Sequence, residues 1–353
     1  MSMRQSRSVS EARPSARTVR LRDLATAQSL FYGVAVETDD LKSDPEFAAC
    51  VARDCGILVP MSALKWRVLR PCPDKYDFSD ADYLADFAKQ HEMLFRGHPL
   101  IWHESLPTWV RERLTKATAE QLLIDHIKHV VGHFAGYIHS WDVVNESIWL
   151  SGGEAQNLCT TPWQRFLGTE YIQLAFHTAH SVDPNALLGL NEFCYFGPDP
   201  RMYDAILNLL DKLITTKTPI HYFGMQAHLR SHELGTAPNI ISNFIRSVGA
   251  LGLKVIITEL DVDDRSLPAN FDDRDRAVGD IYENFMSMVL SEPATMGIIT
   301  WGLSDRYSWL NIPNRWYSLP RQDGLPQRPL PLDIDLQPKP AWYALARAFG
   351  YRG

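Results

Sequence analysis

Short apolar runs rich in β-branched residues alternate with amphipathic stretches along most of the chain. Eight such runs are predicted to be buried strands: residues 30–36, 57–61, 94–100, 138–144, 187–191, 222–226, 254–260 and 297–301. Between them, apolar residues recur at three-to-four spacing, as at Leu123, Ile127 and Val130, which predicts helices. Every crossover is long enough for a parallel connection. The pattern therefore predicts an α/β fold, a single closed (β/α)8 TIM barrel rather than an open sheet.

Helix starts carry polar signals. Thr118, with Gln121 three residues later, has the pattern of a capping box. Thr161 is followed by Pro162, a residue favoured at the first helical position, and then by Gln164. Both threonines are expected to cap the helices that follow them.

The two parts of the chain differ in composition. Residues 1–23 contain arginines and serines and almost nothing apolar, which predicts a disordered arm rather than a binding patch. Residues 24–353 are expected to form the barrel as one domain. The arm has no apolar core of the kind a secretory signal needs. The compartment stays open: cytoplasmic, or exported with the signal absent from this numbering.

Composition excludes some partners. Of the 353 residues, 45% are hydrophobic and 22% charged, and the formal net charge is -7. A net negative charge argues against nucleic acids and anionic membranes as binding partners. It is compatible with a neutral polysaccharide or oligosaccharide as a partner. No apolar run is long enough to span a membrane. The five cysteines are scattered, and a bridge between Cys50 and Cys55 is left open.

Two glutamates close predicted strands. Glu146 ends the run 138–146 (IHSWDVVNE), and Glu259 follows the apolar residues 255–257. In a parallel barrel the carboxyl ends of the strands form the floor of the active site. Each glutamate alone fits a buried ion pair equally well, but two at strand ends match the acid and the nucleophile or base of glycoside hydrolysis. Such chemistry needs no metal and no organic cofactor.

Polar and aromatic residues follow other strands. His98, Trp102 and His103 come after the third strand, and zinc ligation or burial of the histidines in the core are the alternatives to sugar binding. Gln226 and His228 end the sixth strand, where His228 is either structural or keeps a carboxylate ionised. After the eighth strand, Trp301 and Trp309 fit either the core or an apolar wall for sugar rings; all these side chains are candidate site residues.

Together these segments resemble glycoside hydrolase family 10, best known for endo-β-1,4-xylanases. The similarity covers about residues 31–343. Residues 141–146 (WDVVNE) resemble the acid/base segment of that family, and residues 258–261 (TELD) its nucleophile segment. Three further segments match family signatures in order: 97–109 (GHPLIWHESLPTW), 226–228 (QAH) and 301–309 (WGLSDRYSW).

The resemblance implies a retaining, endo-acting glycanase with a (β/α)8 fold. Glu259 would be the nucleophile and Glu146 the acid and base, with carboxyls about 5–5.5 Å apart. Asn145 would bind the sugar 2-hydroxyl, and His228 and Asp261, with His103, would have supporting roles. The glycone side would be lined by Lys65, His98, Trp102, Gln226, Trp301 and Trp309.

One departure from the family concerns specificity. The family has a Glu-Asn pair four and three residues before the lysine that matches Lys65, where this chain has Met61 and Ser62. Ser105 replaces a family glutamine. These changes remove hydrogen-bonding groups that grip the second sugar. We therefore expect a preference for something other than plain xylan, such as a glucan or a bacterial exopolysaccharide.

Two other classes stay open on the sequence alone: a barrel that binds glycans without cutting them, and a metal-dependent barrel hydrolase. Exo versus endo action and the oligomeric state are not decided by the sequence.

Overall fold

The computed structural model describes residues 19–148, 160–194, 201–231, 238–312 and 320–352. Its strands are parallel in every pairing. The strands are β1 (Phe31–Val36), β2 (Ile57–Pro60), β3 (Leu94–Gly97), β4 (Ser140–Asn145), β5 (Leu187–Glu192), β6 (Tyr222–Met225), β7 (His228–Arg230), β8 (Lys254–Asp263) and β9 (Thr295–Thr300).

These strands form a closed barrel. They are ordered β6-β5-β4-β3-β2-β1-β9-β8-β7, and an additional pairing of β6 with β8 closes the ring. All strands except β7 belong to that ring, and each corresponds to one of the predicted apolar runs. The predicted single (β/α)8 TIM barrel is therefore confirmed, and the carboxyl ends of its strands meet at one mouth.

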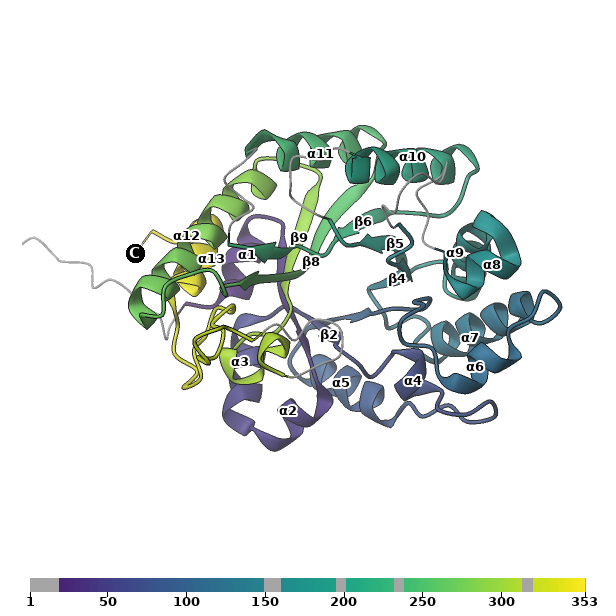
Figure 1. Cartoon of the computed structure of the whole chain (residues 1–353), viewed down its shortest axis with the longest axis horizontal. Coiled ribbons are helices and arrows are strands. Elements are labelled where there is room, and N and C mark those ends of the chain that lie inside the picture. The colour runs from purple at the N-terminus through teal and green to yellow at the C-terminus, as the bar shows by residue number, and fades with distance from the viewer. Residues whose placement is uncertain (1–18, 149–159, 195–200, 232–237, 313–319, 353) are drawn as a thin grey trace, which may run out of the picture.

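Helices surround the strands, as Figure 1 shows. The α-helices are α1 (Leu21–Ala27), α2 (Thr38–Ser43), α3 (Pro45–Asp54), α4 (Trp66–Leu69), α5 (Ser79–Gln90), α6 (Thr108–Arg113), α7 (Ala119–His133), α8 (Pro162–Leu167), α9 (Tyr171–Val182), α10 (Arg201–Thr215), α11 (Pro238–Ala250), α12 (Phe271–Leu290) and α13 (Pro340–Ala348). The last helix, α13, packs against α12 and α1, so the two ends of the described chain meet on one side of the barrel.

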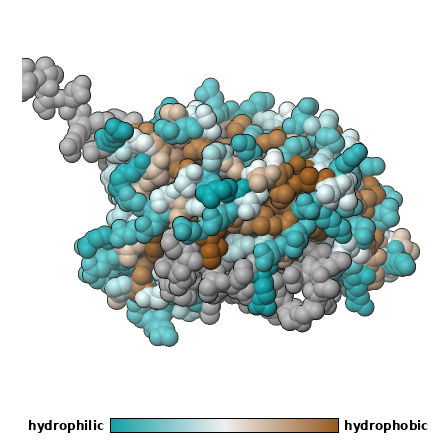
Figure 2. Space-filling model, turned by 90° about the horizontal axis from the view of Figure 1, so that it is seen from above, coloured by the Kyte–Doolittle hydropathy of each residue, from teal (hydrophilic) through white to brown (hydrophobic). Residues whose placement is uncertain are grey.

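Two apolar layers hold the barrel together. The larger lies between the strands and the helices. The smaller includes Ile57, Val59, Ile256 and Ile299 from alternating strand positions, together with Met61 and Trp301. Because burying apolar area contributes about 25 cal/mol per Å², these layers are the main source of stability. The face shown in Figure 2 has hydrophobic residues in a strip between hydrophilic ones.

A polar cluster lies below the mouth. Arg96 of β3 pairs with Asp142 of β4, both fully buried, and Tyr222 donates its hydroxyl hydrogen to the carbonyl oxygen of Trp141 at 2.7 Å. The ring of Trp141 packs against Gly97, where a Cβ atom would lie 2.0 Å from a ring carbon. Only glycine fits this contact, so β3 and β4 approach closely beneath the site.

β7 is a strand that the hydrophobic pattern did not predict. It forms because β8 continues beyond its apolar run to Asp263, which gives residues 228–230 a partner. The register sets His228 opposite Asp261. This short pairing brings two candidate site residues together at the barrel mouth.

Other details differ from the sequence expectations. The predicted domain boundary at residue 23 falls inside α1, because Leu21 and Ala25 are buried; residues 1–18 of the predicted arm lie outside the described residues. Thr161 caps α8 by accepting a hydrogen bond from the Gln164 N–H at 3.0 Å, as predicted. Thr118 does not cap α7, because its hydroxyl donates to the carbonyl oxygen of Arg113 instead.

The thiols of Cys50 and Cys55 are both free. Within the described ranges, no helix combines the length and the apolar character needed to cross a membrane.

Candidate active site

A cavity of about 420 Å³ opens at the carboxyl ends of the strands. Nearly all the predicted site residues line it. They are Lys65, His98, Trp102, Asn145, Glu146, Gln226, His228, Glu259, Asp261, Trp301 and Trp309. His103 does not line this cavity; its Nε2 atom lies 3.2 Å from a carboxylate oxygen of Glu104. The strand ends therefore converge on one cleft.

Glu146 follows β4 in a left-handed turn, with φ of 55°. Each of its carboxyl oxygens has a donor: the indole N–H of Trp102 at 2.8 Å and the amide of Gln226 at 2.9 Å. A non-glycine residue at positive φ is strained, by an amount on the order of 1 kcal/mol. The side chain is thus held at a defined place in the cleft by its neighbours.

Glu259 lies on β8 and is 5% exposed. It accepts a hydrogen bond from the Asn191 amide at 2.8 Å, and the Nε2 atom of His228 lies 3.2 Å from its other oxygen. Burial alone would raise the pKa of Glu259, but the hydrogen bonds and the charge of His228 lower it to about 2. Glu259 is therefore ionised at neutral pH, as a nucleophile must be.

His228 links Glu259 to Asp261. Its Nδ1 atom lies 2.8 Å from a carboxylate oxygen of Asp261. Burial lowers the pKa of His228, but the charge of Asp261 and the hydrogen bonds to both carboxylates raise it to about 10. Asp261 also accepts a hydrogen bond from the indole of Trp309 at 2.6 Å. The imidazolium thus lies between two carboxylates and stabilises both as anions.

A chain of amides joins the two glutamates. Gln226, which contacts Glu146, lies 3.4 Å from the Asn145 side-chain oxygen, and Asn191 donates to that oxygen at 2.8 Å and to Glu259 at 2.8 Å. The oxygen of Asn191 in turn accepts from Thr258 at 2.7 Å. The Asn145 oxygen thus takes both amides, and Asn145 itself lines the cleft. The two glutamates thus share one connected polar floor.

Asn191 and Glu192, at the end of β5, were not among the predicted site residues. Their signal in the sequence was the same as for Glu146: polar residues directly after a buried run. Both are fully buried behind the cleft. Neither lies in a segment that was matched to a family signature, so their position after a buried run was the only signal.

Aromatic rings and one lysine form a wall of the cleft. The Lys65 Nζ atom lies 4.9 Å from the centre of the Trp102 ring and 5.7 Å from that of Trp301. The rings of Trp309 and His228 are 5.1 Å apart. Burial lowers the pKa of Lys65, opposed by the charges of Glu259 and other carboxylates. Flat rings beside polar groups are suited to the apolar faces and hydroxyls of a sugar.

His98 is oriented by the buried polar cluster beneath the mouth of the barrel. Its Nδ1 atom lies 2.8 Å from the carboxylate of Asp142, the same group that pairs with Arg96. The ring meets the Trp301 ring edge-on at 5.3 Å. The polar cluster beneath the mouth therefore orients a residue that lines the cleft.

A carboxylate that the sequence did not indicate lies close to Ser62 and Lys65. Met61 is buried in the inner apolar layer, and the Ser62 hydroxyl donates to Glu37, at the end of β1, at 2.5 Å. Burial raises the pKa of Glu37, while the Ser62 hydrogen bond and the charge of Lys65 lower it. The end of β1 thus supplies a carboxylate next to Ser62, where the family sequence has its carboxylate at the end of β2.

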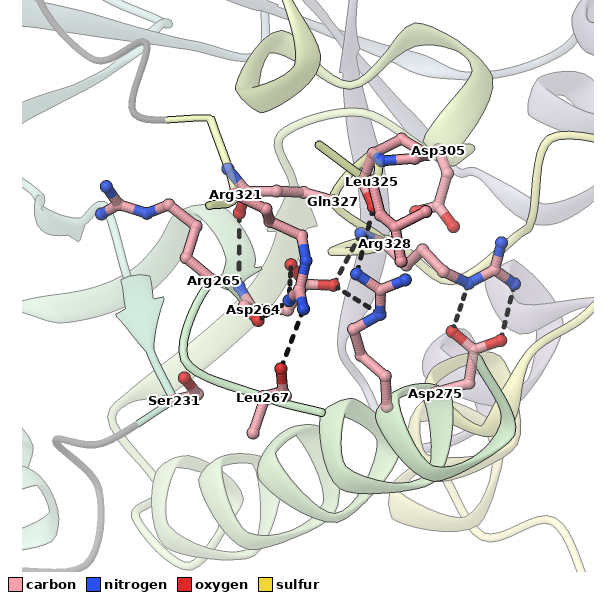
Figure 3. Close-up of polar contacts among 12 residues, drawn as sticks. Ser231, Asp264, Arg265, Leu267, Asp275, Asp305, Arg321, Leu325, Gln327 and Arg328 are labelled. Carbon is pink, nitrogen blue, oxygen red and sulfur yellow. Dashed lines mark hydrogen bonds and ion pairs between the residues drawn. The ribbon is translucent and has the colours of Figure 1, made fainter. Parts of the chain in front are cut away.

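A second polar network anchors the loop after β8 (Figure 3). Arg321 donates to the carbonyl oxygens of Asp264 and of Leu267, the latter at 2.9 Å, and Arg328 pairs with Asp275 of α12 at 2.6 Å. The backbone N–H of Arg328 also reaches the buried Asp264 carboxylate at 2.8 Å. These contacts fix the segment that follows Asp261 and Asp263, and so hold the outer wall of the cleft.

Within the part of the chain that the structure describes, no three His, Cys, Asp or Glu side chains are grouped as metal ligands. The chemistry that the described groups offer is that of an ionised carboxylate and a second carboxyl across one cleft. This fold and this pair of carboxyls define a glycoside hydrolase built on a (β/α)8 barrel.

Comparisons with known proteins agree with this assignment to the glycoside hydrolases. The family described as Glycosyl hydrolase family 10 matches residues 20–348. A Beta-1,4-xylanase of Dictyoglomus thermophilum is 35% identical over 298 residues, covering 82% of this chain and 81% of that protein. Endo-1,4-beta-xylanase B of Paenibacillus barcinonensis is 31% identical over 333 residues, covering 90% and 95%.

Solved structures agree as well. The crystal structure of native xylanase 10B from Thermotoga maritima superposes with a TM-score of 0.83 at 29% identity, covering 94% of this chain and 98% of that chain. Xylanase 10B from Thermotoga petrophila RKU-1, solved in complex with xylobiose, gives the same TM-score of 0.83 at 29% identity, with coverages of 94% and 97%.

The chain belongs to glycoside hydrolase family 10. It is an endo-β-1,4-xylanase-like glycosidase of a family whose members act with retention of configuration.

Proposed function

We propose that this protein cleaves β-1,4-linked xylan-type chains, with Glu259 as the nucleophile and Glu146 as the acid and base. The observation that carries the proposal is the shared cleft: both carboxyls line one cavity and are connected through Gln226, Asn145 and Asn191. The low pKa of Glu259 supplies an anion at neutral pH.

The reaction proceeds in two displacements. In the first, the Glu259 carboxylate attacks the anomeric carbon while Glu146 gives its proton to the glycosidic oxygen, which leaves as an alcohol. In the second, Glu146, now a carboxylate, takes a proton from water. The oxygen of that water attacks the anomeric carbon and releases Glu259. Each step inverts the anomeric centre, so the product has the configuration of the substrate.

Three neighbours support the nucleophile. The cationic His228, held by Asp261, keeps Glu259 ionised and limits its rotation. Asn145, which lines the cleft, would donate from its amide nitrogen to the 2-hydroxyl of the sugar bonded to Glu259. Such a contact strengthens as charge develops in the transition state and lowers the barrier by several kcal/mol in this class of enzyme.

We assign the glycone side of the cleft to Lys65, His98, Trp102, Gln226, Trp301 and Trp309. The rings of Trp102 and Trp301 border the ammonium of Lys65, so a sugar in contact with them meets both an apolar face and a charged donor. His103 stays a supporting residue in this assignment, although it lies outside the cavity lining, with its Nε2 atom 3.2 Å from Glu104.

The preferred polymer depends on the rim formed by Glu37, Met61 and Ser62. Glu37 offers a carboxylate to a second glycone sugar, which favours xylan. Met61 favours a different β-glycan, because a thioether forms no strong hydrogen bond and leaves a roomier, apolar wall for a hexose hydroxymethyl group. We take xylan as the first candidate and a glucan or bacterial exopolysaccharide as the second.

Initial rates on xylan, mixed-linkage glucan, cellulosic oligomers and a bacterial exopolysaccharide at matched concentration test this ranking. The proposal predicts the highest rate on xylan. A rate on any of the other polymers at least about tenfold above that on xylan, equivalent to 1.4 kcal/mol, would assign the second candidate instead.

A barrel that only binds glycans would fail a simpler assay. We expect release of the aryl alcohol from an aryl β-xylobioside, undiminished by a chelator and lost in Glu259→Ala. Absence of release by the wild-type protein would support the binding role, and inhibition by the chelator would support a metal-dependent reaction.

A further inference from the structure

A buried carboxyl group lies directly behind the turn that carries Glu146. Glu192, the last residue of β5, is fully buried and does not line the cleft. Its Oε1 atom accepts hydrogen bonds from the backbone N–H of Ser147 at 2.8 Å and from the Ser147 hydroxyl. Its Oε2 atom accepts from the Ile148 N–H at 3.4 Å. The carboxyl group of Glu192 thus accepts hydrogen bonds from the two residues that immediately follow Glu146.

The end of β5 also holds Glu146 itself. The backbone N–H of Glu146 donates to the carbonyl oxygen of Asn191 at 2.9 Å. Residues 191 and 192 therefore bind three consecutive backbone N–H groups, those of residues 146, 147 and 148. These bonds stabilise the left-handed turn at Glu146, whose φ of 55° a free chain would avoid.

Burying a carboxyl group at this position costs free energy, because the charged form loses its contact with water. Burial raises the pKa of Glu192 to about 8, against the hydrogen bonds from Ser147 and Ile148 that lower it. Among the described residues, no lysine or arginine contacts either of its oxygens, so only N–H and O–H donors offset the burial. With a pKa of about 8 the carboxyl is largely protonated at neutral pH, but each of its oxygens keeps a lone pair that can accept a hydrogen bond. A glutamine would instead turn an NH₂ group, which cannot accept, against an N–H or O–H donor. The donor set therefore fits a carboxyl group better than an amide.

The turn decides where the carboxyl of Glu146 lies. That carboxyl must stay between the indole of Trp102 and the amide of Gln226, at 2.8 and 2.9 Å. A misplacement of about 1 Å in a reacting group costs on the order of 100-fold in rate. A substitution of Glu192 is therefore expected to lower the rate by displacing Glu146, although Glu192 does not contact the substrate.

We propose that Glu192 is the positioning residue of the acid/base: its buried carboxyl holds the turn that carries Glu146 and so places Glu146 to protonate the leaving oxygen. The inference rests on the proposed role of Glu146. It predicts a defect that depends on how much the leaving group needs a proton, which a general loss of folding does not produce.

The test compares kcat/KM, which reports the first displacement, on two substrates with the same glycone. In a 2,4-dinitrophenyl β-xylobioside the leaving group is 2,4-dinitrophenolate, which departs without being protonated. In an unactivated β-1,4-xylo-oligosaccharide the leaving sugar oxygen must receive a proton. We expect Glu192→Gln to lose at least about tenfold on the oligosaccharide and less than about threefold on the dinitrophenyl substrate. Glu192→Asp, which keeps both oxygens, should fall between the wild type and Glu192→Gln.

Two reference variants make the outcome decisive. Glu292→Gln removes another buried carboxyl, paired with Arg246 before β9, and should leave both rates unchanged. Glu146→Ala should show the full leaving-group dependence. If Glu146→Ala shows it and Glu192→Gln loses equally on both substrates, the inference is overturned and the proposed function stands. If Glu146→Ala shows none, the proposed function itself fails.

A fold defect in Glu192→Gln does not remove the test. Ser147→Ala deletes only one donor to the same carboxyl and should show the same dependence at a smaller amplitude. Equal losses on both substrates in Ser147→Ala and Glu192→Asp would reject the positioning role.

Discussion

The amide of Asn191 donates to Glu259 at 2.8 Å and, with its second hydrogen, to Asn145 at 2.8 Å. One buried side chain therefore orients the nucleophile and the residue proposed to bind the sugar beside it. Because Asn191 does not line the cleft, it acts through these two groups and not on the substrate.

Asn191→Ala should lower kcat by on the order of 100-fold with little change in KM, since a preorganised donor to the reacting carboxylate is lost. Steady-state kinetics on an aryl β-xylobioside measures both constants. Asn284→Ala, on the exposed face of α12, is the matched control and should behave as the wild type. A rise in KM at constant kcat would mean that Asn191 serves substrate binding instead.

His228 should make stability depend on pH in the alkaline range. Its pKa rises from 6.5 to about 10 on folding, so the stabilisation by its positive charge is complete below pH 6.5 and is lost as the pH rises through about 10. His228→Asn should lower the free energy of unfolding by about 3 kcal/mol at pH 6, because two buried carboxylates lose their cation.

Urea unfolding of the wild type and of His228→Asn at pH 6 and pH 10 measures this. The difference between the two proteins should shrink at the higher pH. A difference that is constant over this range would show that His228 is neutral in the folded protein.

Glu37 should contribute to the binding of longer substrates only. Glu37→Ala removes the acceptor of the Ser62 hydroxyl and the carboxylate beside Lys65. We expect KM for a xylo-oligosaccharide to rise about tenfold, with the rate on an aryl β-xyloside of one sugar unchanged, since a charged hydrogen bond contributes about 1.5–3 kcal/mol. Glu46→Ala, at an exposed site on α3, is the control. Equal effects on both substrates would place Glu37 outside the distal rim.

The contact between β3 and β4 gives a prediction about stability. Gly97→Ala would set a methyl group 2.0 Å from a ring carbon of the fully buried Trp141. We expect a loss of about 1–3 kcal/mol in the free energy of unfolding, from overpacking. Gly132→Ala, on α7, has its nearest neighbour at 3.7 Å and should be neutral or stabilising by up to about 1 kcal/mol. Thermal melts distinguish the two variants, and equal melting temperatures would refute the close contact.

The barrel was predictable because its strands are short, largely apolar runs, as expected of parallel strands buried on both faces. β7 was not predictable in this way. Residues 228–230 carry a histidine and an arginine, and they pair only because β8 extends to Asp263. A strand whose existence depends on a partner far away in the chain leaves no periodic signal of its own.

The site was predictable where a residue type reports its chemistry. Glu146 and Glu259 could be found because each closes an apolar run within a segment that resembles a signature of the family. Glu37 and Asn191 could not, since their importance comes from contacts with Ser62 and Glu259, which are distant in sequence. The departure at Met61 suggested that the contacts to a second sugar are largely missing, and the carboxylate of Glu37 beside Ser62 is the basis for proposing that β1 supplies one of them.

The central claim is that residue 259 forms a covalent bond to the sugar. A 2,4-dinitrophenyl 2-deoxy-2-fluoro-β-xylobioside loses its activated leaving group, while the fluorine slows the second displacement, so the intermediate accumulates. Mass spectrometry of the protein after this reaction, followed by peptide mapping, should find one added 2-deoxy-2-fluoroxylobiosyl group on Glu259. A protein that stays unlabelled while it hydrolyses xylan, or a label on any other residue, would contradict the account.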